Sequence, residues 1–246
     1  MNYIEIKDFN NNVKALTTTL EFGNMAYQAS KNVEHVSLRR GKLAKDLNID
    51  IKHIVFAHQT NSDVLKYVDE KDYSKGMKSF ESGVEADALY TDKKNIALAI
   101  FHADCVPLFV YVERMPLICI IHAGYKGTLK HISYKVIEEL KNKFKLKGED
   151  FKVVLGPSRN MMDFFINEEE KKEIYAAQLE KAVRLNDEKP ALFDLAFANI
   201  IDLTNAGIPF KNIRDIDINT VDDPNCFSVY NKEKKQGRMC SLILLK

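Results

Sequence analysis

The sequence predicts an α+β fold in a single domain that spans residues 1–246. A chain of 246 residues is long enough for one large domain, and the 46% of hydrophobic residues provide for a sizeable core. Continuous apolar runs of strand length occur together with amphipathic helical segments, and no low-complexity linker or internal repeat divides the chain.

Charge, hydropathy and cysteine usage exclude several classes of protein. The 36 basic and 35 acidic residues give a net charge of +1, so no overall field favours nucleic acid or a membrane as partner. No apolar stretch approaches the roughly 20 residues that a membrane span needs, and the beginning, MNYIEIKDFNNN, lacks the apolar core of a signal peptide. The four cysteines show no CxxC spacing, so we expect reduced thiols and a cytoplasmic protein.

The first half of the chain predicts mainly strands. Short strands and turns are expected over residues 1–30, where YIEI alternates with period two, and a helix over 32–48, with apolar residues near helical spacing. Polar residues and glycine over 69–84 indicate a loop. Continuous apolar runs indicate strands buried on both faces. The expected strands are 51–60, 95–105, 107–112 and 115–124.

The second half predicts three helices and three further strands. Residues 127–145 form an amphipathic helical pattern. Acids in the first turn favour a helix over 167–183, and Asp194 and Gly207 are the expected start and stop signals of a helix over 193–207. A strand is expected over 151–158. The tail from Cys226 reads as a strand, a charged turn and a final strand.

Cys105 and His122 are the side chains most suited to chemistry. Each stands where an apolar strand gives way to small or polar residues, and sites on a rigid scaffold tend to lie there. Cysteine and histidine together are zinc ligands, and they also form a nucleophile–base pair. The alternative is a small buried cysteine and a structural histidine with no part in chemistry.

Six motifs, in order along most of the chain, resemble the bacterial laccase-domain family. They are ADALYTD (86–92), HADCVP (102–107), HAGYKG (122–127), LGPS (155–158), FDL (193–195) and GRMCS (237–241). Members of this family are described as polyphenol oxidoreductases and as zinc-dependent purine nucleoside phosphorylases with adenosine deaminase activity. The resemblance implies a four-layer α/β/β/α arrangement with mixed sheets and a site at strand ends.

The resemblance also implies a zinc site, from which this chain departs at one ligand. In the family, the cysteine and histidine matched by Cys105 and His122 hold zinc together with a further histidine, and Asn61 occupies the position of that histidine. An amide oxygen is a poor zinc ligand, whereas imidazole suits zinc. His58 and His102 are candidate substitutes, although in an extended strand residues 102 and 105 would face opposite sides.

Other departures concern the family's cations and cysteines. Tyr230 stands where the family has an arginine, Lys126 replaces the arginine of its HAGWRG motif, and the paired cysteines after LGPAI are here Met162 and Asp163. Lysine does not reproduce the bidentate grip of arginine on phosphate.

The function implied is phosphorolysis of adenosine and related nucleosides, with adenosine deamination at zinc as a further activity. Lys126 and Arg238 are the candidate phosphate holders, and solvated surface cations are the alternative. His122 or Asp104 would protonate the leaving purine, although we expect Asp104 to orient a metal-bound histidine instead. Tyr125 would stack on the purine, or pack on the sheet. For Asp87 in ADAL, as for Asp104, the alternative is a turn or cap residue.

Two other functions compete with this one. A metal-free cysteine hydrolase would use Cys105 as nucleophile and His122 as base. A nucleoside-binding protein that has lost catalysis would account for Asn61 and Tyr230. Copper oxidase chemistry is the least favoured, because a multicopper site needs many histidines and this chain has six.

Overall fold

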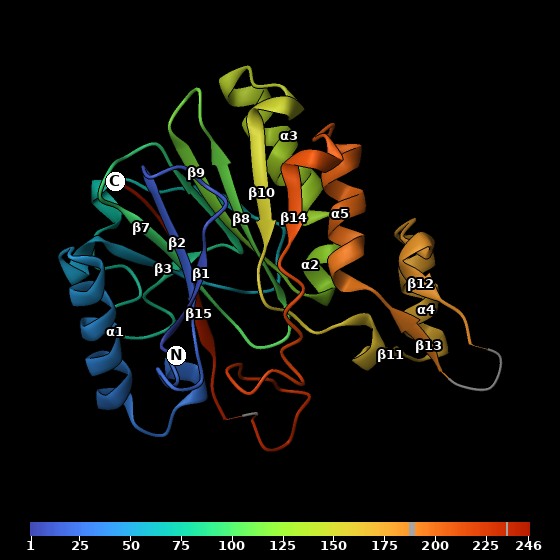
Figure 1. The fold of residues 1–246 in the computed structure, drawn as a ribbon, viewed down its shortest axis with the longest axis horizontal. Helices are drawn as coiled ribbons and strands as arrows, with labels where there is room; N and C mark the ends of the chain where they lie inside the picture. The colour runs from blue at the N-terminus through green and yellow to red at the C-terminus, as the bar shows by residue number, and fades with distance from the viewer. Residues whose placement is uncertain (187–189, 235) are drawn as a thin grey trace.

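Two six-stranded mixed sheets face each other in the computed structural model, which describes residues 1–186, 190–234 and 236–246 (Figure 1). The first sheet runs in the order β1 (Tyr3–Ile6), β2 (Val13–Thr18), β15 (Met239–Leu245), β7 (Ala97–His102), β3 (Ile54–His58) and β5 (Val84–Glu85). The second runs β14 (Ile213–Asp215), β10 (Phe151–Leu155), β8 (Val106–Val112), β9 (Leu117–Ala123), β6 (Ala88–Thr91) and β4 (Leu65–Tyr67).

The two sheets share a core because alternate side chains of each strand point inward. Leu98 and Ile100 of β7 belong to the same buried cluster as Ile118 and Ile120 of β9. The remaining side chains of these strands point to the outer faces, which are buried as well. Strands buried on both faces explain the continuous apolar runs of the sequence.

Helices cover both outer faces and complete four layers (Figure 1). The helix α1 (Val33–Leu47) packs on the first sheet, and α3 (Ile132–Phe144) and α5 (Leu195–Asn205) pack on the second. The short helix α2 (Tyr125–Leu129) follows β9 directly. This arrangement confirms the expected α+β fold with mixed sheets in α/β/β/α layers.

A smaller unit extends from the second sheet, where the sequence predicted no sheet. It consists of β11 (Phe165–Ile166), β13 (Ala191–Phe193) and β12 (Val183–Arg184), together with α4 (Glu168–Ala176). These strands have only two or three residues each, too few for a periodic signal in the sequence.

Three local predictions are wrong. The expected helix 127–145 is divided into α2 and α3 at His131, which has the left-handed φ of 58° and bonds through Nδ1 to Asp202 at 2.8 Å. The helix expected over 167–183 ends at Ala176. The strand expected from Cys226 is a loop, because the backbone of Val229 bonds to a carboxylate instead of a neighbouring strand. Lys235 of the expected charged turn lies outside the described residues.

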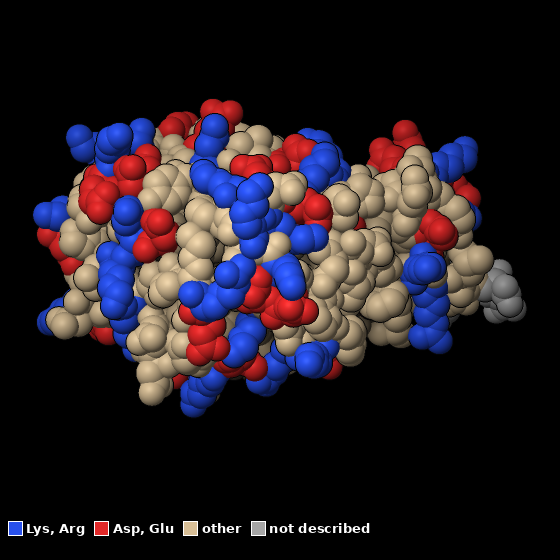
Figure 2. Space-filling view, turned by 90° about the horizontal axis from the view of Figure 1, so that it is seen from above, with Lys and Arg blue, Asp and Glu red and all other residues tan. Residues whose placement is uncertain are grey.

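In the described residues, no helix combines the length and apolar character needed to cross a membrane. All four cysteines are free thiols, as expected. Positive and negative side chains are interspersed over the face shown in Figure 2.

Arg40 of α1 is a fully buried cation that joins α1 to two loops. Its Nε and Nη2 donate hydrogen bonds to the carbonyl of Met25 at 3.1 and 2.9 Å, and its Nη1 donates to the carbonyl of Gly76. The guanidinium carbon lies 4.1 Å from the ring centre of Phe56 and 4.8 Å from that of Phe101. Aromatic faces and carbonyl oxygens therefore replace the water that burial removes.

We expect Arg40→Met to lower the free energy of unfolding by about 3 kcal/mol, because two buried carbonyls lose their donors. Arg40→Lys should recover little of this, since an ammonium cannot reproduce the planar fork. Urea unfolding at neutral pH measures both. Lys42→Met is the control: Lys42 lies on the same helix in an exposed ion pair with Asp46, so its loss should cost less than about 0.5 kcal/mol. Equal effects for Arg40→Met and Lys42→Met would contradict the structural role of Arg40.

Candidate active site

Cys105 and His122 meet at one end of the second sheet. Cys105 lies in the short connection that carries the chain from β7 in the first sheet to β8 in the second. β8 and β9 pair antiparallel with Pro107 opposite His122, so the residue just before β8 lies beside the end of β9. Both residues lie at strand ends, as the sequence predicted. Cys105 follows β7, but the strand that pairs with β9 is β8, which begins just after Cys105.

Gly124 marks the point where Cys105, His122 and Asn61 converge. A Cβ atom on Gly124 would lie 3.1 Å from Cys105 Sγ, 3.3 Å from Asn61 Oδ1 and 3.4 Å from His122 Cε1. Each distance is tighter than ordinary van der Waals contact, so the missing side chain lets the three groups approach. The position that corresponds to the family's third ligand is therefore beside the other two, and it carries an amide.

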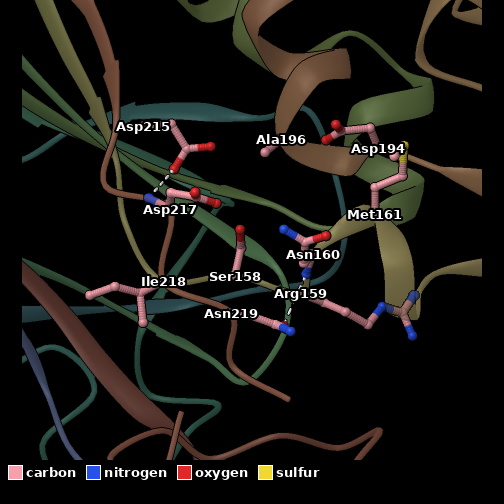
Figure 3. A pocket seen from close by; sticks show the side chains of 10 residues that line it. All are labelled: Ser158, Arg159, Asn160, Met161, Asp194, Ala196, Asp215, Asp217, Ile218 and Asn219. Atoms are coloured by element: carbon pink, nitrogen blue, oxygen red, sulfur yellow. Dashed lines mark hydrogen bonds between the residues drawn. The ribbon is translucent and has the colours of Figure 1, made fainter. Parts of the chain in front are cut away.

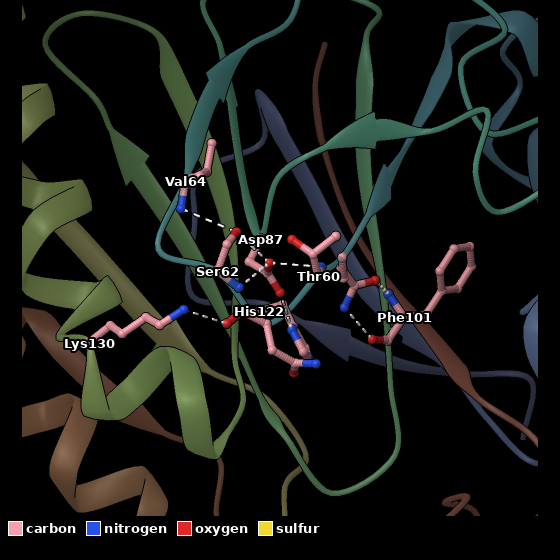
Figure 4. A network of polar contacts seen from close by, with 9 residues as sticks. Thr60, Ser62, Val64, Asp87, Phe101, His122 and Lys130 are labelled. Carbon is pink, nitrogen blue, oxygen red and sulfur yellow. Dashed lines mark hydrogen bonds and ion pairs between the residues drawn. The ribbon is translucent and has the colours of Figure 1, made fainter.

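Asp87 holds His122 and the Asn61 loop in place (Figure 4). Its Oδ1 bonds to Nδ1 of His122 at 2.8 Å, and the His122 backbone N–H donates to the Asp87 carbonyl at 2.7 Å. Its Oδ2 accepts from the N–H of Thr60 at 3.0 Å and from the N–H and hydroxyl of Ser62, both at 2.7 Å. Asp87 is fully buried, so both oxygens depend on these partners.

Asp87 occupies Nδ1 of His122, so Nε2 is the ring nitrogen that remains for Cys105 or a ligand. Burial lowers the pKa of His122, but the charge of Cys105 and the hydrogen bonds with Asp87 and Cys105 outweigh it and raise the pKa to about 9. Burial raises the pKa of Asp87, but the hydrogen bonds from His122 and Ser62 prevail and lower it below the ordinary value. The order Asp87, His122, Cys105 is that of a nucleophile held by an oriented base.

Asp104 does not orient His122, and that expectation is corrected. Its Oδ1 accepts from the Thr220 hydroxyl at 2.7 Å, and its Oδ2 accepts from the N–H groups of Val229 and Tyr230 at 2.8 and 3.1 Å. Its backbone has φ of 101°, a region that non-glycine residues rarely adopt. Asp104 therefore fixes the 220–230 loop beside Cys105, and Asp87 is the carboxylate that orients the histidine.

A cavity of about 330 Å³ opens onto this centre. That volume is within the ordinary range of small-molecule pockets. Its walls come from both sheets and from several loops. The lining residues are Gln28, Gln59, Asn61, Phe80, Phe101, His102, Ala103, Cys105, His122, Val229 and Arg238.

Two of the expected substrate-binding residues lie outside the lining of this cavity. The ring of Tyr125 packs against Phe193 at 6.1 Å between centres, and its hydroxyl donates to Glu173 at 2.9 Å, so a stacking role at this cavity is not supported. Phe80 and Phe101 are the aromatic residues of the lining. Lys126 is exposed on α2 and is not part of the lining.

Neither substitute histidine completes a metal site. His58 packs edge-on against Phe80 with 4.7 Å between ring centres. His102 lines the cavity, but its Nε2 bonds to the Ser241 hydroxyl at 2.8 Å. Burial and the charges of His122 and Arg238 lower its pKa to about 3, so the ring is neutral.

The donor set does not fit a three-ligand zinc centre. Cys105 and His122 supply a sulfur and a nitrogen, but the third group at their meeting point is the amide oxygen of Asn61. Within residues 1–186, 190–234 and 236–246, no three His, Cys, Asp or Glu side chains are arranged to hold a metal ion.

Sequence reasoning missed three contributors to the site. Asp87 was named only with the alternative of a turn or cap residue. Its place opposite His122 follows from the β6–β9 pairing, in which Ala88 faces Ile121. Phe80 lies in a segment interpreted only as a loop. Arg159, whose N–H donates to the carbonyl of Asp104 at 2.9 Å, follows the LGPS motif and gave no signal of its own.

Comparisons with known proteins agree with the motifs. Residues 15–246 match the family model described as multi-copper polyphenol oxidoreductase laccase. The chain belongs to this family. A protein from Bacillus subtilis named purine nucleoside phosphorylase YlmD is 29% identical over 237 residues, covering 95% of this chain and 83% of that protein. A Staphylococcus aureus protein of the same name is 29% identical over 224 residues, 89% of this chain and 83% of that protein.

Solved structures of the laccase-like family show the same fold. The crystal structure of Bacillus licheniformis hypothetical protein YfiH superposes with a TM-score of 0.93 at 29% identity, covering 100% of this chain and 97% of that one. YlmD from Geobacillus stearothermophilus superposes with a TM-score of 0.90 at 22% identity, covering 96% and 93% of the two chains.

We expect Asp87→Asn to lower the free energy of unfolding by about 3 kcal/mol near neutral pH, because it breaks a buried charged pair. The pKa of His122 is raised from 6.5 to about 9, so its proton stabilises the fold below pH 6.5, and this stabilisation is lost as the pH rises through about 9. The loss of stability over this pH range should be smaller in Asp87→Asn than in the wild type. Urea unfolding across that range measures it, with Asp63→Asn, an exposed acid paired with Lys135, as control. Parallel pH profiles for wild type and Asp87→Asn would contradict the pairing.

Asn61→His should create the zinc site that this chain lacks. We expect the affinity for zinc to rise by at least about tenfold, because an imidazole replaces a weak amide donor. Substitutions of residues that only support a metal ligand already change metal affinity by about that factor. Metal content after dialysis against a zinc chelator measures it without reference to catalysis. Asn61→Ala is the matched control and should bind zinc as weakly as the wild type. Equal zinc content in the wild type and Asn61→His would show that Asn61 does not limit metal binding.

Proposed function

We propose that this member of the laccase-like family is a purine nucleoside phosphorylase-like enzyme, with adenosine among its nucleosides and inorganic phosphate as second substrate. The observation that carries the proposal is the convergence of Cys105, His122 and Arg238 on one cavity with aromatic walls. The names of the Bacillus and Staphylococcus relatives support the same reaction class.

The cavity has suitable groups for each part of such a substrate. Phe80 and Phe101 offer apolar faces for a purine ring. Arg238 donates to the Gly237 carbonyl at 2.8 Å through Nη1, and among the described residues its other guanidinium donors have no partner, so they could hold an anion. Lys126, exposed on the helix that follows His122, adds positive charge at longer range.

Phosphorolysis exchanges one bond at the sugar for another. A phosphate oxygen forms a bond to the anomeric carbon as the bond from that carbon to the purine nitrogen breaks, and the electron pair of the broken bond goes to the base. Positive charge builds on the sugar in the transition state, as in other glycosidic cleavages. The enzyme must therefore bring an anion to the sugar and supply a proton to the base.

His122 is the proton donor in this proposal. Asp87 fixes its Nδ1, so Nε2 carries the proton that faces Cys105 and the cavity. The hydrogen bond with Asp87 favours the protonated ring until the leaving base takes the proton. Asp104 acts as a positioning residue, since it holds the loop of Val229 against the cavity.

The proposal covers phosphorolysis and does not extend to deamination. Deamination of adenosine by a zinc-held hydroxide requires a bound metal and three protein ligands. Because Asn61 stands at the third position, we derive no such step for this chain.

A cysteine hydrolase is the second candidate, and the hydrogen-bonded order Asp87, His122, Cys105 favours it. In that reaction the Cys105 sulfur would attack an acyl carbon, and His122 would protonate the leaving group. Water would then release the acyl group from the sulfur, so this reaction needs an acyl substrate and no phosphate. It predicts rapid alkylation of Cys105, and a thiol-reactive probe measures that beside the adenosine assay.

We expect protein of known metal content to convert adenosine to adenine only when phosphate is present. Cys105→Ala should abolish this conversion, because it removes the thiol that adjoins His122 in the cavity. Separation of the products by chromatography is the measurement. Cys119→Ala is the matched control: Cys119 is buried in the same hairpin beneath α3, outside the cavity lining, and its loss should leave turnover intact.

The other outcomes discriminate among the alternatives. Inosine would indicate deamination, and adenine without phosphate would indicate hydrolysis. Thermal stabilisation by adenosine without turnover, also after zinc loading, would mean that the chain binds nucleosides and has lost catalysis. Each of these results would overturn the phosphorylase proposal.

A further inference from the structure

Arg159 places a guanidinium beside the candidate active site, where no role has been assigned to it. Its backbone is tied to Asp104, the neighbour of Cys105, by the hydrogen bond of 2.9 Å. Its guanidinium carbon lies 3.4 Å from the ring centre of Phe164 and 5.0 Å from that of Tyr230. Two aromatic rings therefore hold the side chain in one orientation.

The donors of this guanidinium are unused in the part of the chain that the structure describes. Its Nε is buried without a hydrogen-bond partner. Arginine ion pairs there are those of Arg114 with Asp150 and Arg214 with Asp8, so Arg159 has none. A cation with unsatisfied donors is costly to bury, and an oxyanion would satisfy the whole fork at once.

Nearby carboxylates do not take the place of such an anion. Arg159 is outside the lining of the active-site cavity and lines a separate small pocket with Asp215 and Asp217, but its side chain extends away from both (Figure 3). Asp163 also lies near, and its Oδ2 accepts a hydrogen bond from the Asn219 amide at 2.8 Å. Asp104 also lies near, yet its two oxygens already accept three hydrogen bonds from the 220–230 loop. Burial lowers the pKa of Arg159, and the charges of Asp104 and Cys105 oppose that effect. The guanidinium adjoins the cavity wall at Tyr230, whose neighbour in sequence, Val229, belongs to the lining.

Arg159 contacts Tyr230, a position at which this chain departs from the family pattern. Tyr230 stands where the family pattern has an arginine, and in this structure its ring lies against the guanidinium of Arg159. The positive charge absent from the 229–230 loop is thus supplied from the loop after β10. Tyr230 also donates its backbone N–H to Asp104, which keeps the two loops together.

We propose that Arg159, held by Phe164 and Tyr230, forms an oxyanion subsite at the edge of the active site that binds a phosphate group through the guanidinium fork. The inference rests on the proposed function for its ligand, inorganic phosphate as second substrate. The phosphate of a nucleotide has the same chemistry, and the experiment separates the two sources.

The test compares wild type, Arg159→Gln and Arg159→Lys for thermal stabilisation by inorganic phosphate and by adenosine 5′-monophosphate. Arg159→Gln should need about tenfold or more phosphate for half of the effect, since it loses charge-assisted hydrogen bonds. Arg159→Lys should lie between, because it keeps the charge and loses the fork. Arg114→Gln is the control: it removes an exposed arginine from the β8–β9 turn and should bind phosphate as the wild type does.

Turnover of adenosine distinguishes substrate binding from a structural role. Arg159→Gln should raise the KM for phosphate about tenfold and leave the KM for adenosine unchanged. Unchanged phosphate affinity in Arg159→Gln, or a wild type that phosphate and nucleotide fail to stabilise, would overturn the subsite. Stabilisation by nucleotide alone that depends on Arg159 would support the subsite with a phosphate ester as ligand.

The two proposals fail separately. A wild type without phosphorolysis, but with phosphate binding that depends on Arg159, would overturn the proposed function and leave the subsite standing. A wild type that carries out phosphorolysis, with a KM for phosphate that does not depend on Arg159, would overturn the subsite and leave the proposed function standing.

Discussion

The site depends on one buried carboxylate, that of Asp87. Its two oxygens receive the ring of His122 and three donors from the Thr60–Ser62 turn, and no water reaches it. Removing an ionised carboxylate from water costs several kcal/mol unless such partners replace the solvent, so the turn and the histidine are fixed together. Asn61 lies inside this turn with the left-handed φ of 57°, and its amide is thereby directed to Cys105. The turn that carries Asn61 is therefore fixed beside Cys105 and His122.

Asp104 imposes the same kind of constraint on the opposite side of Cys105. It joins the loop after β10 and the 220–230 loop to the connection between the two sheets. A left-handed backbone at an aspartate is strained by about 1–3 kcal/mol, and such strain persists only where surrounding contacts fix it. Cys105 thus lies near two carboxylates that bond to the neighbouring loops. Carboxylates that position loops, and cations that face the cavity, make a site suited to anionic ligands.

The strands, the α+β class and the convergence of Cys105 with His122 could be predicted, because strand periodicity and apolar runs are local signals. The partners of the site could not. The contact of Asp87 with His122 spans 35 positions and that of Asp104 with Val229 spans 125, and neither separation leaves a pattern in the sequence. Tyr125 illustrates the opposite error: it follows His122 closely in sequence, but the start of α2 turns its ring toward Phe193 and away from the cavity. Closeness to His122 in the sequence therefore did not place Tyr125 in the cavity, because the strand gives way to a helix between them.

The replacements at Asn61 and Tyr230 form a coherent set when charge is considered. A zinc ion would bring two positive charges to the point where Cys105, His122 and Asn61 meet, and an anionic substrate would feel them strongly at the low dielectric of this cavity. A centre without that ion needs other cations to attract phosphate. This chain has Arg238 in the cavity wall, and Arg159 lies against the ring of Tyr230, next to Val229 of the lining. On this view Asn61 is not a lesion in an otherwise zinc-dependent site; it belongs to a site whose positive charge is carried by side chains.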